Sequence, residues 1–81
     1  MKSVELFRTA LRSKWKHNGS AAKALNVGDS MISDVLAGRR RISVWLARQV
    51  EIATGTPGVA VELLHAQVAD DLEELALENK A

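Results

Sequence analysis

Apolar residues along this chain recur three and four positions apart, which is the period of amphipathic α-helices. Near the amino terminus they form one stripe, made of Val4, Phe7, Leu11 and Trp15. Ser3 is expected to cap this helix, and Glu5 lies in its first turn, where a carboxylate favours the helix dipole. Basic residues lie off the stripe, at Arg8, Arg12, Lys14 and Lys16. The pattern predicts a first helix that forms the floor of the core.

The stretch from Ala21 to Gly38 contains two short helical patterns separated by the break Asn26-Val27-Gly28. Asn18 or Ser20 is expected to cap the first of them. Two short helices joined by a glycine-containing turn of this length are the signature of a helix-turn-helix. The side chains expected between the two helices are apolar, at Leu25, Val27, Ile32 and Val35. An ordinary helical hairpin is the alternative interpretation.

The other face of the second short helix is small or polar, and in a helix-turn-helix this face enters the major groove of DNA. Its members are Gly28, Asp29, Ser30, Ser33, Asp34 and Ala37. Gly38 is expected to end the helix in the left-handed conformation. Three consecutive arginines follow, at Arg39, Arg40 and Arg41. We expect them to clamp phosphates, because such crowding is costly unless an anion neutralises it; a solvated basic loop is the alternative.

Two further helices are expected after the arginines. The first is capped by Ser43, ends at Gly55 and leaves Trp45 off its apolar face, available to a tail or a dimer interface. Its buried face is expected to contain Leu46, Ala47, Val50 and Ala53. Thr56-Pro57 is predicted to be the cap and first-turn proline of the last helix.

The last helix is expected to run from about residue 59 to residue 79, a stretch without glycine or proline. Its apolar residues form a narrow stripe, made of Val61, Leu64, Val68, Leu72 and Leu75. Leu63 lies off the stripe and is expected to close the core. The later part of the helix either overhangs and meets a partner, most simply a second copy, or folds back along its own domain.

Charge divides the chain into two unlike parts. Residues 1–48 carry a net charge of +7 and residues 49–81 a net charge of −6, so the total of +1 conceals the asymmetry. A basic segment can hold phosphates, whereas an acidic one is repelled by them. We therefore predict a helix-turn-helix domain over residues 1–66, with the motif at about 18–38. Residues 67–81 form an acidic helical extension for dimerisation or partner binding.

Several kinds of site are not expected. The chain has no cysteine, and His17 and His65 are far apart, so no metal-ligand spacing exists. No glycine-rich phosphate loop is present, and the acidic pairs lie in a solvated helix. We expect no enzyme, no metal and no cofactor. No apolar run approaches membrane-spanning length and the amino terminus lacks a signal-peptide core, which favours the cytoplasm.

Three motifs in order resemble the Cro/cI-like phage repressor superfamily, most closely its YdaS-type, Cro-like prophage regulators. They are Gly38-Arg39-Arg40, then Val50-Glu51-Ile52-Ala53-Thr54-Gly55, then Val59-Ala60-Val61-Glu62-Leu63-Leu64. The match covers roughly residues 18–64. The resemblance implies an all-α fold, a compact four- to five-helix lambda-repressor-like helix-turn-helix domain, here with an extended C-terminal helix.

The resemblance also implies roles for individual residues. Asn18 falls where the family often has a glutamine that contacts phosphate, and Ser30, Ser33 and Asp34 fall at base-facing positions, with Asp29 at the helix start. Asn26 replaces the expected turn glycine and tolerates the same left-handed conformation. The helix continues through His65, whereas the family commonly has a proline near Leu64. Since the outer face has no Arg, Lys or Gln, DNA shape is expected to supply much of the specificity.

The sequence therefore predicts a sequence-specific, DNA-binding transcriptional regulator, a repressor of phage or prophage type that acts as a homodimer on a pseudo-palindromic operator in a bacterial cell, associated with the nucleoid. Expected base contacts are Asp29, Ser30, Ser33 and Asp34; expected phosphate contacts are Asn18, Lys23, Arg39, Arg40 and Arg41; expected interface residues are Trp45, Val68, Leu72 and Leu75. The alternative is an antitoxin-like or antirepressor-like interaction protein, whose acidic helix binds a toxin or RNA polymerase and for which DNA is secondary.

Overall fold

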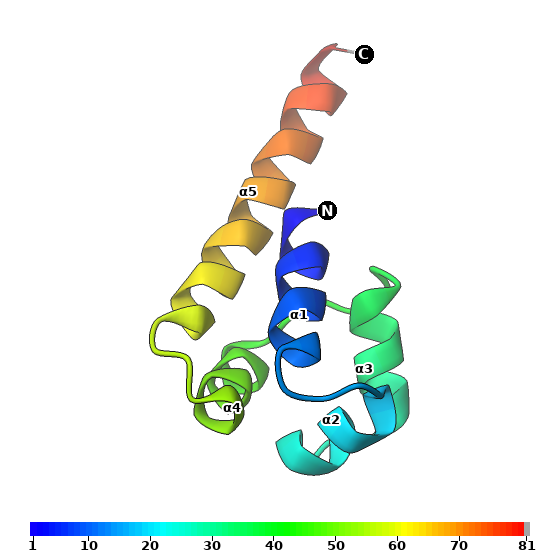
Figure 1. The fold of residues 1–81 in the computed structure, drawn as a ribbon. Coiled ribbons are helices and arrows are strands. Elements are labelled where there is room, and N and C mark those ends of the chain that lie inside the picture. The colour runs from blue at the N-terminus through cyan, green and yellow to red at the C-terminus, as the bar shows by residue number, and fades with distance from the viewer. Residues whose placement is uncertain (81) are drawn as a thin grey trace.

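Five α-helices make up the protein in a computed structural model that describes residues 1–80 (Figure 1). They are α1 (Lys2–Arg12), α2 (Asn18–Leu25), α3 (Asp29–Leu36), α4 (Val44–Thr54) and α5 (Val59–Lys80). The all-α class with a long last helix is confirmed. Among the described residues, no helix is both long and apolar enough to cross a membrane.

All five helices contribute to one hydrophobic core. The buried apolar residues are Phe7 and Leu11 of α1, Ala21, Ala22 and Leu25 of α2, Ile32 and Val35 of α3, Leu46, Ala47 and Val50 of α4, Val59 and Leu63 of α5, and Ile42 of the loop before α4. Ala21 and Ala22 of α2 are fully buried, which lets its backbone lie close to its neighbours. The wedge predicted between α2 and α3 is therefore present.

The start of α1 differs from the prediction. The helix begins at Lys2 and its N-cap is Met1, so Ser3 is not the cap. Ser3 is buried inside the first turn, and its hydroxyl donates a 2.5 Å hydrogen bond to the carboxylate of Asp70 on α5. The same carboxylate accepts the backbone N–H groups of Lys2 at 2.8 Å and Ser3 at 3.1 Å. A distant residue thus caps α1, which local sequence does not reveal.

Other helix ends also differ from expectation. The apolar stripe predicted for α1 is longer than the helix itself. The helix ends at Arg12, and Trp15 lies in the following turn, partly buried against the core. The N-cap of α2 is His17 and not Asn18 or Ser20.

Pro57 is not in the first turn of α5, since that helix begins at Val59. The carboxylate of Glu51 instead accepts the N–H groups of Gly58 and Ala60, at 2.9 and 3.2 Å, and so caps the start of α5.

The predicted ends of α4 are confirmed. The Ser43 hydroxyl accepts the Leu46 N–H at 3.0 Å, and Gly55 ends the helix in the left-handed region at φ = 67°. Three of the four residues expected on its buried face are buried, and Ala53 is half-buried. The Ala53 carbonyl accepts a 2.6 Å hydrogen bond from Nζ of Lys14, so the last turn of α4 is tied to the segment after α1.

Helix α5 begins in the core and then projects beyond it, as the upper part of Figure 1 shows. Val59 and Leu63 are buried, so the prediction that Leu63 closes the core is confirmed. Residues 67–71 still contact the rest of the domain, so the contacts do not end at the expected boundary after residue 66. Every residue from 72 to 79 is exposed. Of the two arrangements considered for this helix, the overhang is observed.

Candidate nucleic-acid interface

The α2–α3 pair is joined by a tight turn built on Asn26. Asn26 has φ = 58° and ψ = 45°, which is the left-handed conformation that its predicted role requires. The Val27 N–H reaches back to the Ala22 carbonyl at 2.9 Å, a bond that closes the end of α2 in a Schellman-type turn. Val27 then packs against the core. The local geometry expected of a helix-turn-helix is therefore present.

The outer face of α3 is open to solvent. Asp29, Ser30, Ser33 and Ala37 are exposed, while Ile32 and Val35 point into the core. Gly38 follows with φ = 78°, as predicted, and turns the chain away from the helix axis. The face is small and carries hydroxyl groups, which can donate and accept hydrogen bonds with either base pair.

Asp29 belongs to the contact between the two helices. It is the first residue of α3, and its Oδ2 lies near Gly19 in the first turn of α2, 3.8 Å from where a Cβ of residue 19 would be. A carboxylate at this point is favoured by the N-terminal ends of both helices. Asp29 is still exposed, but it serves the junction of α2 and α3 as well as the outer face.

Asp34 and Arg39 form one polar unit at the end of α3. Oδ1 of Asp34 accepts hydrogen bonds from Nη2 of Arg39 at 2.9 Å and from Nε at 3.2 Å. The Asp34 side chain is 37% exposed and the Arg39 side chain 67% exposed. Arg39 is therefore held at Asp34 near the end of α3, with most of its side chain exposed. Asp34, expected as a separate base acceptor, has a partner within its own chain.

Arg41 points in another direction, toward α5. Its Nη1 and Nη2 donate to the two carboxylate oxygens of Asp71, each at 2.8 Å. The hydrogen bond and the charge of Asp71 raise the pKa of Arg41 above its usual value. In return, the hydrogen bond from Arg41 lowers the pKa of Asp71, against a smaller opposing effect of burial. This bidentate pair fixes the arginine loop to α5.

The loop is also held by an amide. Gln67 of α5 accepts the Ile42 N–H at 2.7 Å and donates to the Ile42 carbonyl at 2.9 Å, so one side chain satisfies both backbone groups. Sequence reasoning did not identify Gln67. The only signal was a polar residue on the side of α5 that also carries the buried Leu63.

The three arginines are consequently not equivalent. Arg39 forms an ion pair with Asp34, and Arg41 forms one with Asp71, whereas Arg40 forms no ion pair within the described part of the chain. Lys23, expected on phosphate, is exposed on α2. Arg39 and Arg40 follow the end of α3 directly in the chain, and Lys23 is an exposed cation on the helix before it.

Asn18 also has a partner that sequence reasoning did not identify. Its side-chain carbonyl accepts a hydrogen bond from the Arg12 guanidinium, which the bond brings to the first turn of α2. Arg12 thus adds a positive charge beside a helix N-terminus, the kind of place where anions bind to exposed N–H groups.

The residues expected at a dimer or partner interface lie on two helices. Trp45 of α4 is 48% exposed, and on α5 the exposed fractions are 53% for Val68, 62% for Leu72 and 53% for Leu75. His17, which precedes α2, and His65 of α5 are also exposed. Within residues 1–80, no three His, Cys, Asp or Glu residues are grouped closely enough to hold a metal ion.

Comparison with protein-family models, curated proteins and solved structures found no match for this chain.

Proposed function

We propose that the protein is a sequence-specific DNA-binding regulator of the Cro-like type, which represses transcription by occupying a promoter in a bacterial cytoplasm. The observation that carries the proposal is the α2–α3 unit. Its turn has the left-handed geometry at Asn26, and its second helix presents Ser30 and Ser33 to solvent and is followed at once by the exposed Arg39 and Arg40. A helix with this exposure, followed by these cations, fits a major groove bordered by phosphates.

The side chains suggest a division of roles. Lys23, Arg40 and Arg12 supply charge for phosphates, which fixes the position of the protein without reading sequence. Ser30 and Ser33 have short side chains whose hydroxyl groups can either donate to or accept from base edges, so they discriminate only weakly between bases. Arg39 is the one long donor held against the end of α3, because Asp34 orients it. Much of the sequence preference then comes from the shape and deformability of the DNA.

The test is selection from a randomised DNA pool at near-physiological salt, with sequencing of the bound fraction. We expect an enriched palindrome whose half-sites lie about one helical turn apart, because a two-fold dimer places two copies of α3 on one face of DNA. Enrichment of nothing beyond bulk DNA would contradict sequence reading and leave only phosphate binding by the basic half.

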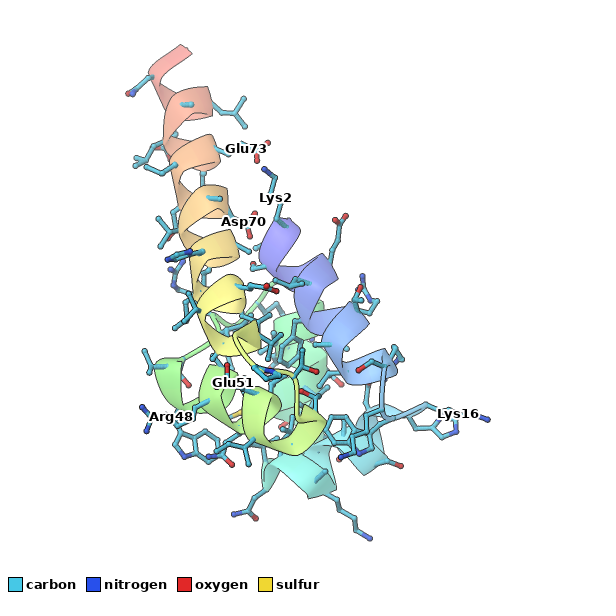
Figure 2. All side chains as sticks on the ribbon, turned by 60° about the vertical axis from the view of Figure 1, so that its left-hand side comes forward. Lys2, Lys16, Arg48, Glu51, Asp70 and Glu73 are labelled. Carbon is cyan, nitrogen blue, oxygen red and sulfur yellow. The ribbon has the colours of Figure 1, made fainter. Side chains whose placement is uncertain are left out.

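Two variants separate the roles, and a third is the control. Arg40→Ala should weaken binding to all sequences and lower the slope of log K against log salt concentration by about 0.9. Ser33→Ala should instead change which sequence is enriched. Arg48→Ala removes the same charge from the outer side of α4, away from the α2–α3 unit, and should leave the salt slope unchanged (Figure 2).

A second candidate is an interaction protein whose acidic α5 binds a toxin or RNA polymerase. The observation that favours it is the exposed apolar surface of the overhang, where Leu72 and Leu75 are more than half exposed. Replacing both leucines with serine and fusing an unrelated dimerising helix distinguishes the two. A regulator that needs only a dimer regains repression in cells, whereas one that needs a partner on α5 does not.

A further inference from the structure

Helix α5 has two apolar faces, and only one of them meets the domain. Val59 and Leu63 are buried, and Gln67 and Asp70 continue this side through their hydrogen bonds to the loop and to α1. On the opposite side, residues recur with alternating spacings of four and three. We name this set the outer seam; it consists of Val61, His65, Val68, Leu72, Leu75 and Asn79.

The outer seam has the spacing of the a and d positions of a coiled coil. Val61, Val68 and Leu75 take the d positions, and Leu72 takes an a position between the polar residues His65 and Asn79. All six residues are exposed. The seam runs along nearly the whole of a 22-residue helix, both over the domain and along the overhang. A face of this length with heptad spacing can pair with another helix by knobs-into-holes packing.

We propose that the outer seam pairs with the outer seam of a second copy, in a parallel and in-register two-stranded coiled coil. This deepens the proposed function by assigning the surface and orientation of the dimer, and it rests on that function for one of its arguments. Of the exposed interface residues expected from sequence, Val68, Leu72 and Leu75 belong to the seam, whereas Trp45 lies on α4.

Charge favours a second copy over a basic partner. Three of the six acidic residues of α5 do not border the seam: Asp70 faces α1, and Glu73 and Glu74 take the b and c positions. Of the three that border it, Asp71 is already neutralised by Arg41 of the same chain, and Glu62 and Glu78 lie near opposite ends of the helix. A basic helix on the seam would therefore find few carboxylates to pair with.

The residues flanking the seam favour the parallel orientation. One flank (the g positions) contains Leu64, Asp71 and Glu78, and the other (the e positions) contains Glu62, Ala69 and Ala76. In a parallel pair unlike flanks meet, so that Asp71 comes next to Ala76 of the second copy and no acids oppose one another. In an antiparallel pair like flanks meet, so that the acidic flank of one copy lies along the acidic flank of the other.

The position of the α2–α3 unit gives the same orientation, and this step rests on the proposed function. In Figure 1, α2 and α3 lie at the end of the molecule opposite to the C-terminus of α5. A two-fold axis along paired parallel α5 helices places both α3 helices at the same end, where one DNA duplex can meet them. An antiparallel pair would place them at opposite ends.

The experiment uses engineered cysteines, because the natural chain has none to interfere. Leu75→Cys places a thiol in the seam, and Leu77→Cys is the matched control, since Leu77 is at least as exposed (64% against 53% for Leu75) but lies off the seam. Both full-length variants are oxidised at micromolar concentration without DNA and analysed by non-reducing electrophoresis. We expect a disulfide-linked dimer for Leu75→Cys and a monomer for Leu77→Cys.

Each other outcome overturns a stated part of the proposal. Equal cross-linking of both variants would show a surface without register. Cross-linking only when Leu75→Cys is mixed with His65→Cys would show an antiparallel pair. If none of these variants forms a cross-link and the protein sediments as a monomer, the proposed dimer is wrong.

Failure of the dimer is distinguishable from failure of the proposed function. Leu72→Asp should raise the Kd of the dimer by about 30-fold or more, compared with little change for Leu77→Asp, in sedimentation without DNA. DNA selection then tests sequence reading separately. A cross-linked dimer that enriches no sequence supports the seam and contradicts the function.

Discussion

Replacing Asp70 with alanine tests the contact that fixes where α5 leaves the domain. The carboxylate of Asp70 accepts three hydrogen bonds from the first turn of α1, from the Lys2 and Ser3 backbone N–H groups and from the Ser3 hydroxyl. In Figure 2, Asp70 lies beside the start of α1, close to Lys2. Alanine removes both acceptor oxygens, and with them all three hydrogen bonds, and leaves the buried Ser3 hydroxyl without its partner.

The expected loss of stability follows from the environment of each bond. The bond to Lys2 is exposed and contributes little, whereas the two bonds to Ser3 are partly buried and go to a charged acceptor. Loss of a helix N-cap costs about 0.5–2 kcal/mol, and a hydrogen bond to a charged group contributes about 1.5–3 kcal/mol. We expect a total loss of about 2 kcal/mol, which corresponds to a fall in Tm of about 8–16 °C for a domain of this size.

Thermal and urea unfolding, followed by circular dichroism, measure this loss. The pH dependence provides a second readout. Burial acts to raise the pKa of Asp70, but the hydrogen bonds from Ser3 and Lys2 and the nearby amino terminus together lower it below the ordinary 3.8. A lowered folded-state pKa stabilises the protein above the unfolded value, and this contribution is lost as the pH falls through the folded value. The stability difference between wild type and Asp70→Ala should therefore be constant above about pH 5 and shrink below 3.8.

Glu73→Ala is the matched control, because it removes the same charge one turn further along α5 from an exposed residue (Figure 2). It should change the free energy of unfolding by less than about 0.5 kcal/mol. Equal losses for Asp70→Ala and Glu73→Ala would refute the capping role of Asp70. So would additive losses in a double-mutant cycle with Ser3→Ala, because two residues in direct contact should be energetically coupled.

Three further predictions concern the turn, the start of α5 and the arginine loop. Asn26→Val should destabilise the protein by about 1–2 kcal/mol in urea unfolding while Asn26→Gly is tolerated, because the residue has φ = 58°; equal stability of both variants would contradict this. Glu51→Ala should cost about 1 kcal/mol by removing the cap on Gly58 and Ala60, with exchange of those amides speeding up first. Under the proposed function, Asp71→Asn should release Arg41, strengthen DNA binding and steepen the salt slope by about 0.9; an unchanged slope would mean that Arg41 cannot reach phosphate.

The elements that were predicted correctly are those governed by neighbouring residues. Ser43 caps α4 from three positions before Leu46, and Gly38, Gly55 and Asn26 take left-handed conformations that follow from their own steric freedom. The same holds for the open polar face of α3, which follows from helical spacing. Such features depend on interactions between residues a few positions apart, so the local sequence is enough to predict them.

The features that were missed depend on contacts between distant segments. The cap on α1 comes from Asp70, 67 positions after Ser3, and Arg41 is bound to Asp71, 30 positions later. Arg39 and Arg41 look alike in sequence, yet one turns to α3 and the other to α5. Each arginine pairs with the carboxylate that the tertiary packing brings within reach, and the local sequence does not indicate which carboxylate that is.

Helix α5 combines features that the sequence determines with features that only the tertiary structure determines. Its sequence alone determined a long, uninterrupted helix, because it has neither glycine nor proline to end it. The spacing of its apolar residues also places them on more than one side of that helix. The sequence also placed Leu63 in the core, but only the tertiary structure decided that the later part of the helix overhangs, with Val68 and Leu72 facing solvent, and does not fold back along its own domain. The reason is physical: both faces are apolar, and the one that is buried is the one against which α1, α4 and the arginine loop can also satisfy their polar groups.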